Sequence, residues 1–164
     1  MKLEQRALRF QCGGNALIGI VDVPERALMR GLLMLADSGQ YRTGSYRQFT
    51  LLARLLAGRG VAVMRFDRAG AGDSEGRTGD QAGGGDIAGA MNEFFTHVPE
   101  MKESVILAAG DAAGAAATYA AGDARVAGLA LFNPALAQAA PSARSLALRA
   151  LGSYAPPLLR RHLP

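Results

Sequence analysis

Cysteine and histidine are scarce in this chain of 164 residues, which contains one cysteine and two histidines. A single cysteine excludes a disulfide within the chain, and the lack of a Cys-x-x-Cys motif or a Cys/His cluster excludes the usual zinc sites. We therefore expect neither a metal nor a cofactor. The lone thiol, Cys12, lies on an early predicted strand, where we expect it to be buried and not catalytic.

Long apolar runs and dense charged tracts are also missing. No uncharged segment reaches the roughly 18 apolar residues of a membrane-spanning helix, and the N-terminus has no apolar signal core. The 18 basic and 14 acidic residues give a net charge of +4, but the basic residues are scattered and do not alternate with aromatic ones. We therefore expect a cytoplasmic protein without a membrane span and without a nucleic-acid partner.

Short apolar segments alternate with helical patterns along the chain. The Gly13-Gly14-Asn15 turn predicts an N-terminal hairpin, and four further segments have the continuous apolar character of strands buried on both faces. Strands that alternate with helices at this spacing predict an α/β fold, with a mostly parallel sheet covered by helices on both faces. The predicted strands are 7–12, 16–23, 31–36, 61–66, 105–109 and 126–132, and the predicted helices begin at the capping residues Ser45, Asp86 and Asp111.

Residues 1–140 form the predicted core, and residues 141–164 form a separate basic tail. The tail has one short helical pattern that ends near Leu151, followed by two prolines. A short interrupted helix is a weak membrane anchor. We interpret the tail as a lid or cap fragment that folds over the strand ends.

Ligands of open α/β sheets bind beyond the carboxyl ends of the strands. The segments 37–40, 67–76, 110–111 and 133–134 follow predicted strands and are therefore the candidate site. The glycines of 70–76 have the spacing GxGxxxG, follow the fourth strand of the chain and do not lead directly into a helix. This pattern argues against a dinucleotide site, and the chain has no GxxxxGK[ST] phosphate-binding loop.

Several segments together resemble a known family. They are GQYRTGSYRQF at 39–49, LLAR at 51–54, RFD at 65–67, GDSEG at 72–76, DAA at 111–113 and RVAGL at 125–129 with Asn133-Pro134. At this spacing the chain is similar to the α/β-hydrolases associated with the exosortase A system, of the hydrolase 1 type. The resemblance implies an α/β-hydrolase fold, acyl or ester hydrolysis, a small acyl or ester ligand, and a link to exopolysaccharide systems.

The resemblance also implies a nucleophile elbow at 107–114. Such an elbow is a sharp turn from strand to helix that holds a Ser or Cys side chain clear of the sheet, beside backbone N–H groups that stabilise an oxyanion. Aligned on the family, the cysteine position falls on Gly110, whereas a GxSxG pattern over 110–114 would put Ala112 there. Either alignment leaves the elbow without a nucleophile.

Other positions also depart from the family pattern, and these departures again argue against an intact catalytic triad. Tyr46 stands where the resemblance implies a histidine, Ala69 replaces an arginine, and Asp37-Ser38 replace small glycines. Neither His97, at the end of the second helix, nor His162, in the tail, follows a late strand as a triad histidine would. We expect the sheet to be truncated after its sixth strand, without the strands that carry the acid and the histidine.

The remaining candidates have both a functional and a structural interpretation. Ser38, Gly39, Gln40 and Asp111 are candidates for the oxyanion loop and pocket, although an Asp at a helix start is more often an N-cap. Asp73 and Ser74 could bind substrate, but in such a loop they more often support the turn.

Two functions follow from these residues. The first is an acyl or ester hydrolase that is impaired or inactive because the elbow nucleophile and the late histidine are missing. The alternative is a non-catalytic module that binds a small acyl ligand or takes part in an assembly. A sheet that ends at its sixth strand would expose an edge, and we expect that edge to allow a homodimer.

Overall fold

The computed structural model describes residues 3–37, 39–77 and 84–134. This part of the chain has six strands and three α-helices, which alternate from the third strand onward, with one short 3-10 helix before the first α-helix. The strands are β1 (Leu3–Cys12), β2 (Asn15–Pro24), β3 (Arg30–Leu35), β4 (Val63–Phe66), β5 (Glu103–Ala109) and β6 (Val126–Phe132). The helices are η1 (Ser45–Arg47), α1 (Gln48–Ala57), α2 (Gly85–His97) and α3 (Ala112–Ala120).

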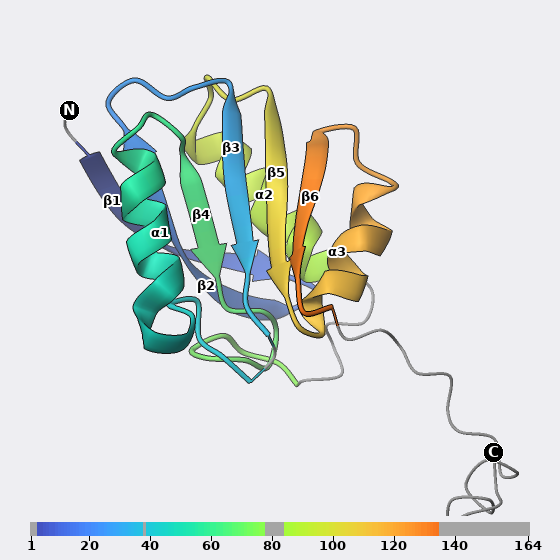
Figure 1. Ribbon diagram of the computed structural model, residues 1–164. Helices are drawn as coiled ribbons and strands as arrows, with labels where there is room; N and C mark the ends of the chain where they lie inside the picture. The colour runs from blue at the N-terminus through green and yellow to red at the C-terminus, as the bar shows by residue number, and fades with distance from the viewer. Residues whose placement is uncertain (1–2, 38, 78–83, 135–164) are drawn as a thin grey trace, which may run out of the picture.

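The strands form one sheet in the order β1-β2-β4-β3-β5-β6 (Figure 1). Strand β2 is antiparallel to both of its neighbours, whereas β4, β3, β5 and β6 run parallel to one another. The predicted α/β fold, with its N-terminal hairpin and mostly parallel sheet, is confirmed. The four parallel strands end at the same edge of the sheet, at the bottom of Figure 1.

Helices cover both faces of the sheet, as the sequence predicts. Helices α2 and α3 pack on one face, where the apolar stripe of α2 enters the larger core. Helix α1 packs on the other face over β3, β4 and β5 in a smaller core. The predicted stripe of α2 is buried at Ile87, Ala90, Met91, Phe94 and Val98.

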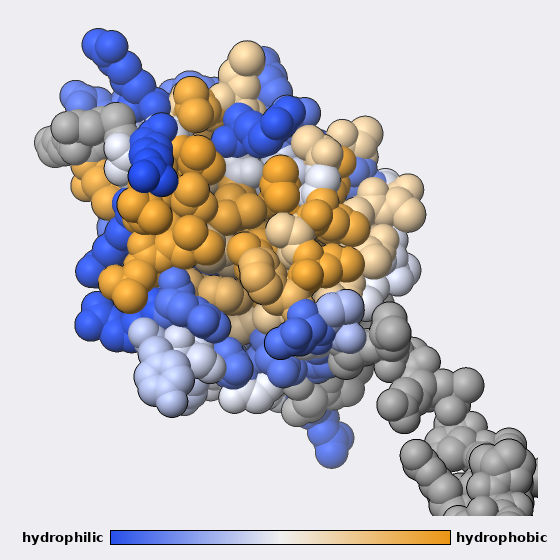
Figure 2. Space-filling model, in the orientation of Figure 1, coloured by the Kyte–Doolittle hydropathy of each residue, from blue (hydrophilic) through white to orange (hydrophobic). Residues whose placement is uncertain are grey.

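Strand β6 differs from its prediction as a buried strand. Its residues alternate between intermediate and exposed, and 59% of Phe132 is accessible to solvent. The reason is its position, because within the described residues β6 pairs with β5 alone. Figure 2 shows apolar residues gathered on the face that α1 only partly covers, and the exposed large side chains of α1 and β6 are Leu51, Leu55, Leu129, Leu131 and Phe132.

Two predicted helix caps are wrong. Ser45 begins η1 and not α1, and Tyr46 and Arg47 between them have φ values of 51° and 62°. Positive φ is unfavourable for residues with a Cβ, so this connection is strained. Asp86 lies inside α2, where it is buried and accepts a hydrogen bond of 3.1 Å from the guanidinium of Arg68. Its other carboxylate oxygen accepts the N–H of Ile87 at 2.9 Å, so Asp86 binds a first-turn N–H from within the helix, whereas Gly84 occupies the N-cap position.

The predicted tail, residues 141–164, lies outside the described residues, as does His162. The boundary of the core at residue 140 therefore stays a prediction. Among the helices that the structure describes, none is long and apolar enough to cross a membrane.

Candidate functional site

The loops that follow β3, β4 and β5 meet at the carboxyl edge of the sheet. Asp67 joins the first two of these loops, because its buried carboxylate accepts the main-chain N–H of Arg42 at 2.6 Å and that of Asp73 at 3.0 Å. The guanidinium of Arg42 also binds Asp67, and it binds the carboxylate of Asp73 at 2.8 Å. Gly72 makes this contact possible, since a Cβ at residue 72 would overlap the Asp67 carboxylate.

The glycine-rich loop is further tied to strand β2. The Ser74 hydroxyl donates to the Asp67 carbonyl at 2.7 Å and accepts the N–H of Ile18 at 2.9 Å. Glu75 accepts the N–H of Ala16 at 2.9 Å through its side chain and donates its own N–H to the Ala16 carbonyl. The polar groups of this loop are therefore engaged in holding its shape.

The turn from β5 into α3 is made at Gly110, which has a φ of 58°. Its N–H donates to the carbonyl of Phe132 at 3.0 Å, which joins the turn to the end of β6. A positive φ at a strand-to-helix turn is the strained geometry by which an elbow lifts a side chain away from the sheet. Ala112, the other residue that the sequence suggested for the nucleophile, is fully buried in the first turn of α3.

The carboxylate of Asp37 lies directly over this turn. A Cβ built on Gly110 would be 2.5 Å from Oδ2 of Asp37 and 2.6 Å from its Cγ. Real Cβ atoms essentially never come so close to another heavy atom, so Asp37 fills the space of a side chain at residue 110. The structure thus unites Asp37, from the loop after β3, with the elbow, a contact that sequence reasoning missed.

The other residues proposed for the pocket have different environments. Gln40 is half-buried and donates its N–H to the Asp37 carbonyl at 2.8 Å, whereas Gly39 is exposed. Ser38 lies outside the described residues. Asp111 directly precedes α3, as expected of an N-cap, but its side chain makes no capping hydrogen bond with the helix. Tyr46 is 99% exposed, so its side chain lies in solvent.

His97 and Cys12 lie away from the carboxyl edge. His97 ends α2 with its ring 3.7 Å from Glu93, and its carbonyl accepts a hydrogen bond of 3.2 Å from Arg6 on β1. Cys12 is half-buried, not fully buried as predicted, and its thiol donates to the Gly85 carbonyl at 2.9 Å. Burial raises the pKa of this thiol, with a further contribution from Asp86, and therefore disfavours the reactive thiolate.

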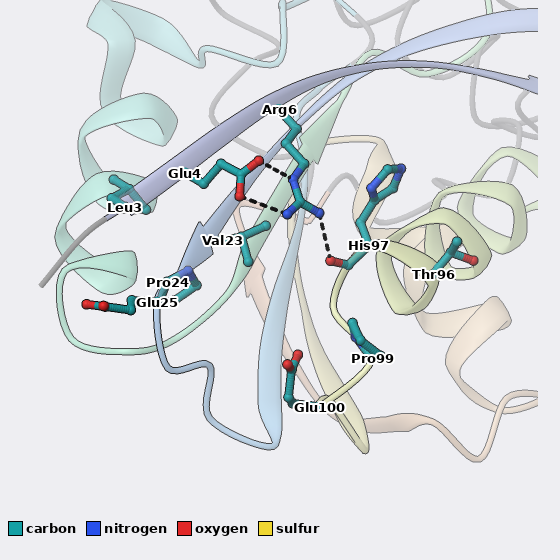
Figure 3. A pocket seen from close by; sticks show the side chains of 10 residues that line it. All are labelled: Leu3, Glu4, Arg6, Val23, Pro24, Glu25, Thr96, His97, Pro99 and Glu100. Carbon is teal, nitrogen blue, oxygen red and sulfur yellow. Dashed lines mark hydrogen bonds and ion pairs between the residues drawn. The ribbon is translucent and has the colours of Figure 1, made fainter.

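An open cleft of about 720 Å³ lies at the opposite end of the sheet from the elbow (Figure 3). The ends of β1, β2 and α2 form it, which is why no contiguous motif indicates it. Arg6 crosses the cleft between the carboxylate of Glu4, at 2.7 Å, and the His97 carbonyl. In the described part of the chain, no group of three or more His, Cys, Asp or Glu residues could hold a metal ion.

A mostly parallel sheet with an antiparallel N-terminal hairpin, helices on both faces and a positive-φ glycine turn after β5 defines an α/β-hydrolase fold. Residues 38–162 match the family described as serine aminopeptidase S33, and the chain belongs to this family. No curated protein sequence matches the chain.

Solved α/β-hydrolase structures have the same fold at low sequence identity. An esterase of Pyrococcus furiosus is 17% identical with a TM-score of 0.72, over 97% of this chain and 59% of the esterase. A cold-adapted esterase from an Arctic intertidal metagenomic library is 19% identical with a TM-score of 0.62, over 79% of this chain and 60% of that one. A dienelactone hydrolase from Anabaena variabilis is 18% identical with a TM-score of 0.60, over 80% of this chain and 63% of the hydrolase. The chain thus spans less than two thirds of each of these proteins.

Proposed function

We propose that this chain binds a small acyl or ester ligand at the carboxyl edge of its sheet and does not form an acyl-enzyme there. The S33 family and the esterases among the structural neighbours support an ester as the ligand. The observation that supports the lack of an acyl-enzyme is the structure of the elbow itself. Gly110 has the positive φ of a nucleophile position but no side chain, and Asp37 fills the space. Without a Ser or Cys at the elbow, the acyl-enzyme route of serine and cysteine hydrolases is closed.

We assign the nucleophile position of the fold to Gly110, not to Ala112. Gly110 is half-buried and its missing Cβ points toward the loop after β3, whereas Ala112 points into the core. The proposed pocket then consists of Gly39, Gln40 and Asp111 around this turn. Ser38, the fourth candidate, lies outside the described residues and is proposed on its sequence position alone. Asp73 and Ser74 support it from the glycine-rich loop through their bonds to Arg42 and Ile18.

A labelling experiment tests the missing nucleophile. We expect no covalent adduct by intact-protein mass spectrometry after treatment with a fluorophosphonate, and no burst of p-nitrophenol with p-nitrophenyl acetate. An esterase with an intact serine triad, treated in parallel, is the positive control. An adduct on this chain would contradict the proposal.

Thermal stabilisation tests the ligand. A ligand that binds only the folded protein raises its melting temperature as its concentration exceeds the Kd. We expect short-chain acyl esters and the corresponding carboxylates to stabilise the chain. Stabilisation without turnover would favour the alternative function, a non-catalytic binding or assembly module, and stabilisation by none of these compounds would rule out the acyl ligand.

We further propose a role in the cytoplasm beside an exosortase-linked exopolysaccharide system. This part is supported by the resemblance of GQYRTGSYRQF at 39–49 and GDSEG at 72–76 to the hydrolases of those systems. Deletion of the gene in its host should then change the amount or acylation of exported polysaccharide. An unchanged polymer, or recovery of the protein outside the cytoplasmic fraction, would argue against this role.

A further inference from the structure

Two departures from the hydrolase pattern meet at one point in the structure. Residue 110 has lost the elbow side chain, and residue 37, where the resemblance implies a small glycine, has gained a carboxylate. The carboxylate oxygen Oδ2 of Asp37 lies 2.5 Å from the Cβ position of residue 110. The two changes are therefore sterically linked, because Asp37 could not hold this position if residue 110 carried a side chain.

From this geometry we propose that Asp37 is the catalytic base of the site, and that it activates a water molecule for direct attack on the carbonyl carbon of a bound ester. The proposal deepens the proposed function and rests on it. The reaction needs no covalent intermediate with the protein. It is a single displacement in place of the double displacement of a serine hydrolase.

Asp37 is the only residue that accepts and returns a proton in this reaction. Oδ2 of Asp37 accepts a proton from water while the water oxygen forms a bond to the carbonyl carbon, which gives a tetrahedral oxyanion. The intermediate then collapses, the carbon–oxygen bond to the leaving alkoxide breaks, and the alkoxide takes the proton from Asp37. The products are a carboxylic acid and an alcohol, and Asp37 returns to its ionised form.

The position of the carboxylate suits this role. The elbow side chain is the group that a hydrolase of this fold presents to its substrate carbonyl, and Asp37 Oδ2 lies within a bond length or two of where that side chain would begin. A general base must lie within hydrogen-bond reach of the proton that it accepts, or one water molecule away. In this fold the N–H after the elbow residue stabilises the oxyanion, and in this chain that group is the N–H of Asp111.

The backbone around Asp37 fixes where its carboxylate can go. The Asp37 carbonyl accepts the N–H of Gln40, which closes a tight turn directly after β3. A few residues further on, Arg42 is bound to the buried Asp67, so both sides of the loop are anchored. Anchoring at both sides holds a catalytic group in place without cost at the moment of reaction.

Hydrolysis of p-nitrophenyl acetate by three variants tests the proposal. Asp37→Asn keeps the shape of the side chain but removes the base, and we expect kcat/KM to fall by about 100-fold or more with an unchanged melting temperature. Asp37→Ala should be equally impaired, but added formate should restore part of its activity by entering the vacated space. Glu100→Gln, an exposed residue at the opposite end of the sheet, is the matched control and should retain wild-type activity.

The outcomes separate this inference from the function on which it rests. If Asp37→Asn retains wild-type kcat/KM within about threefold, Asp37 only fills space and the inference is wrong, while the proposed function stands. If the wild type is stabilised by esters but does not hydrolyse them, the inference is again wrong and binding remains. An acyl group found on Asp37 by mass spectrometry would make it a nucleophile and overturn the single displacement. If the wild type is neither stabilised by esters nor able to hydrolyse them, both proposals are wrong.

Discussion

Arg42 binds the buried carboxylate of Asp67 twice, once through its main-chain N–H at 2.6 Å and once through its guanidinium. The two residues belong to the loops after β3 and β4, which are neighbours at the carboxyl edge of the sheet. Burial by itself lowers the pKa of Arg42, but its hydrogen bonds to Asp73 and Asp67 outweigh this effect and raise it. The contact therefore holds the candidate site together with a permanently charged guanidinium.

Removal of this cation should destabilise the fold. Arg42→Ala leaves the Asp67 carboxylate buried without its charged partner, and we expect a loss of about 3 kcal/mol in the free energy of unfolding. Urea denaturation measures the change. Arg59→Ala, at an exposed arginine after α1, is the control and should change stability by less than about 0.5 kcal/mol. Equal effects of the two variants would show that the contact between Arg42 and Asp67 contributes nothing to the free energy of unfolding.

The close approach of Asp37 to Gly110 predicts coupled effects on stability. Gly110→Ala forces a Cβ into both a positive φ and the Asp37 carboxylate, and it should destabilise by about 2 kcal/mol. Combination with Asp37→Gly should recover about 1 kcal/mol of that loss, because the overlap is then relieved while the backbone strain remains.

A glycine in the adjacent helix controls for the general effect of alanine. A Cβ on Gly114 of α3 meets no atom within 4 Å, so Gly114→Ala should stabilise the protein by about 0.5–1 kcal/mol. Strictly additive effects of Gly110→Ala and Asp37→Gly in denaturant titrations would refute the predicted overlap.

Asp123 should make part of the stability depend on acid pH. The guanidinium of Arg125, at 2.6 Å, and the hydroxyl of Tyr119 hold the pKa of this carboxyl far below its ordinary value of 3.8, against an opposing effect of burial. Because the folded pKa is lowered, the stabilisation is present above the unfolded pKa and is lost as the pH falls from about 4 toward 2. Asp123→Asn should flatten stability against pH in this window, measured by urea midpoints. A slope as steep as that of the wild type would contradict the assignment, and Glu100→Gln serves as the control.

Strand β6 should allow the chain to pair with a second copy of itself. In the described part its outer edge has no partner strand, and Leu131 and Phe132 are 40% and 59% exposed. Unpaired strand edges with apolar side chains favour association. We expect a dimer by size-exclusion chromatography with light scattering and a monomer for Leu131→Lys. Leu51→Lys removes an even more exposed leucine from α1 and should leave the dimer intact. A monomeric wild type at all concentrations would exclude this interface.

Much of the fold is predictable from local pattern. Continuous apolar segments indicate strands inside a parallel sheet, and the i, i+3, i+4 spacing of 87–98 indicates the buried face of α2, because both periods follow from backbone geometry. The helix starts are less predictable. Asp86 has the chemistry of a cap, yet it pairs with Arg68, a residue 18 positions away that local sequence does not relate to it.

The candidate site, like the fold, is only partly predictable from the sequence. The sequence by itself determined the order of the elements, the loops that end up at the carboxyl edge, and the absence of a serine or cysteine between residues 107 and 114, because these properties depend on residue type and on neighbours along the chain. Only the tertiary structure decided which of Gly110 and Ala112 faces the site and that Asp37 occupies the space at residue 110. That contact joins residues 73 positions apart, and it depends on the parallel pairing of β3 with β5, which brings Leu35 beside Ala108 and aligns the turns that follow them.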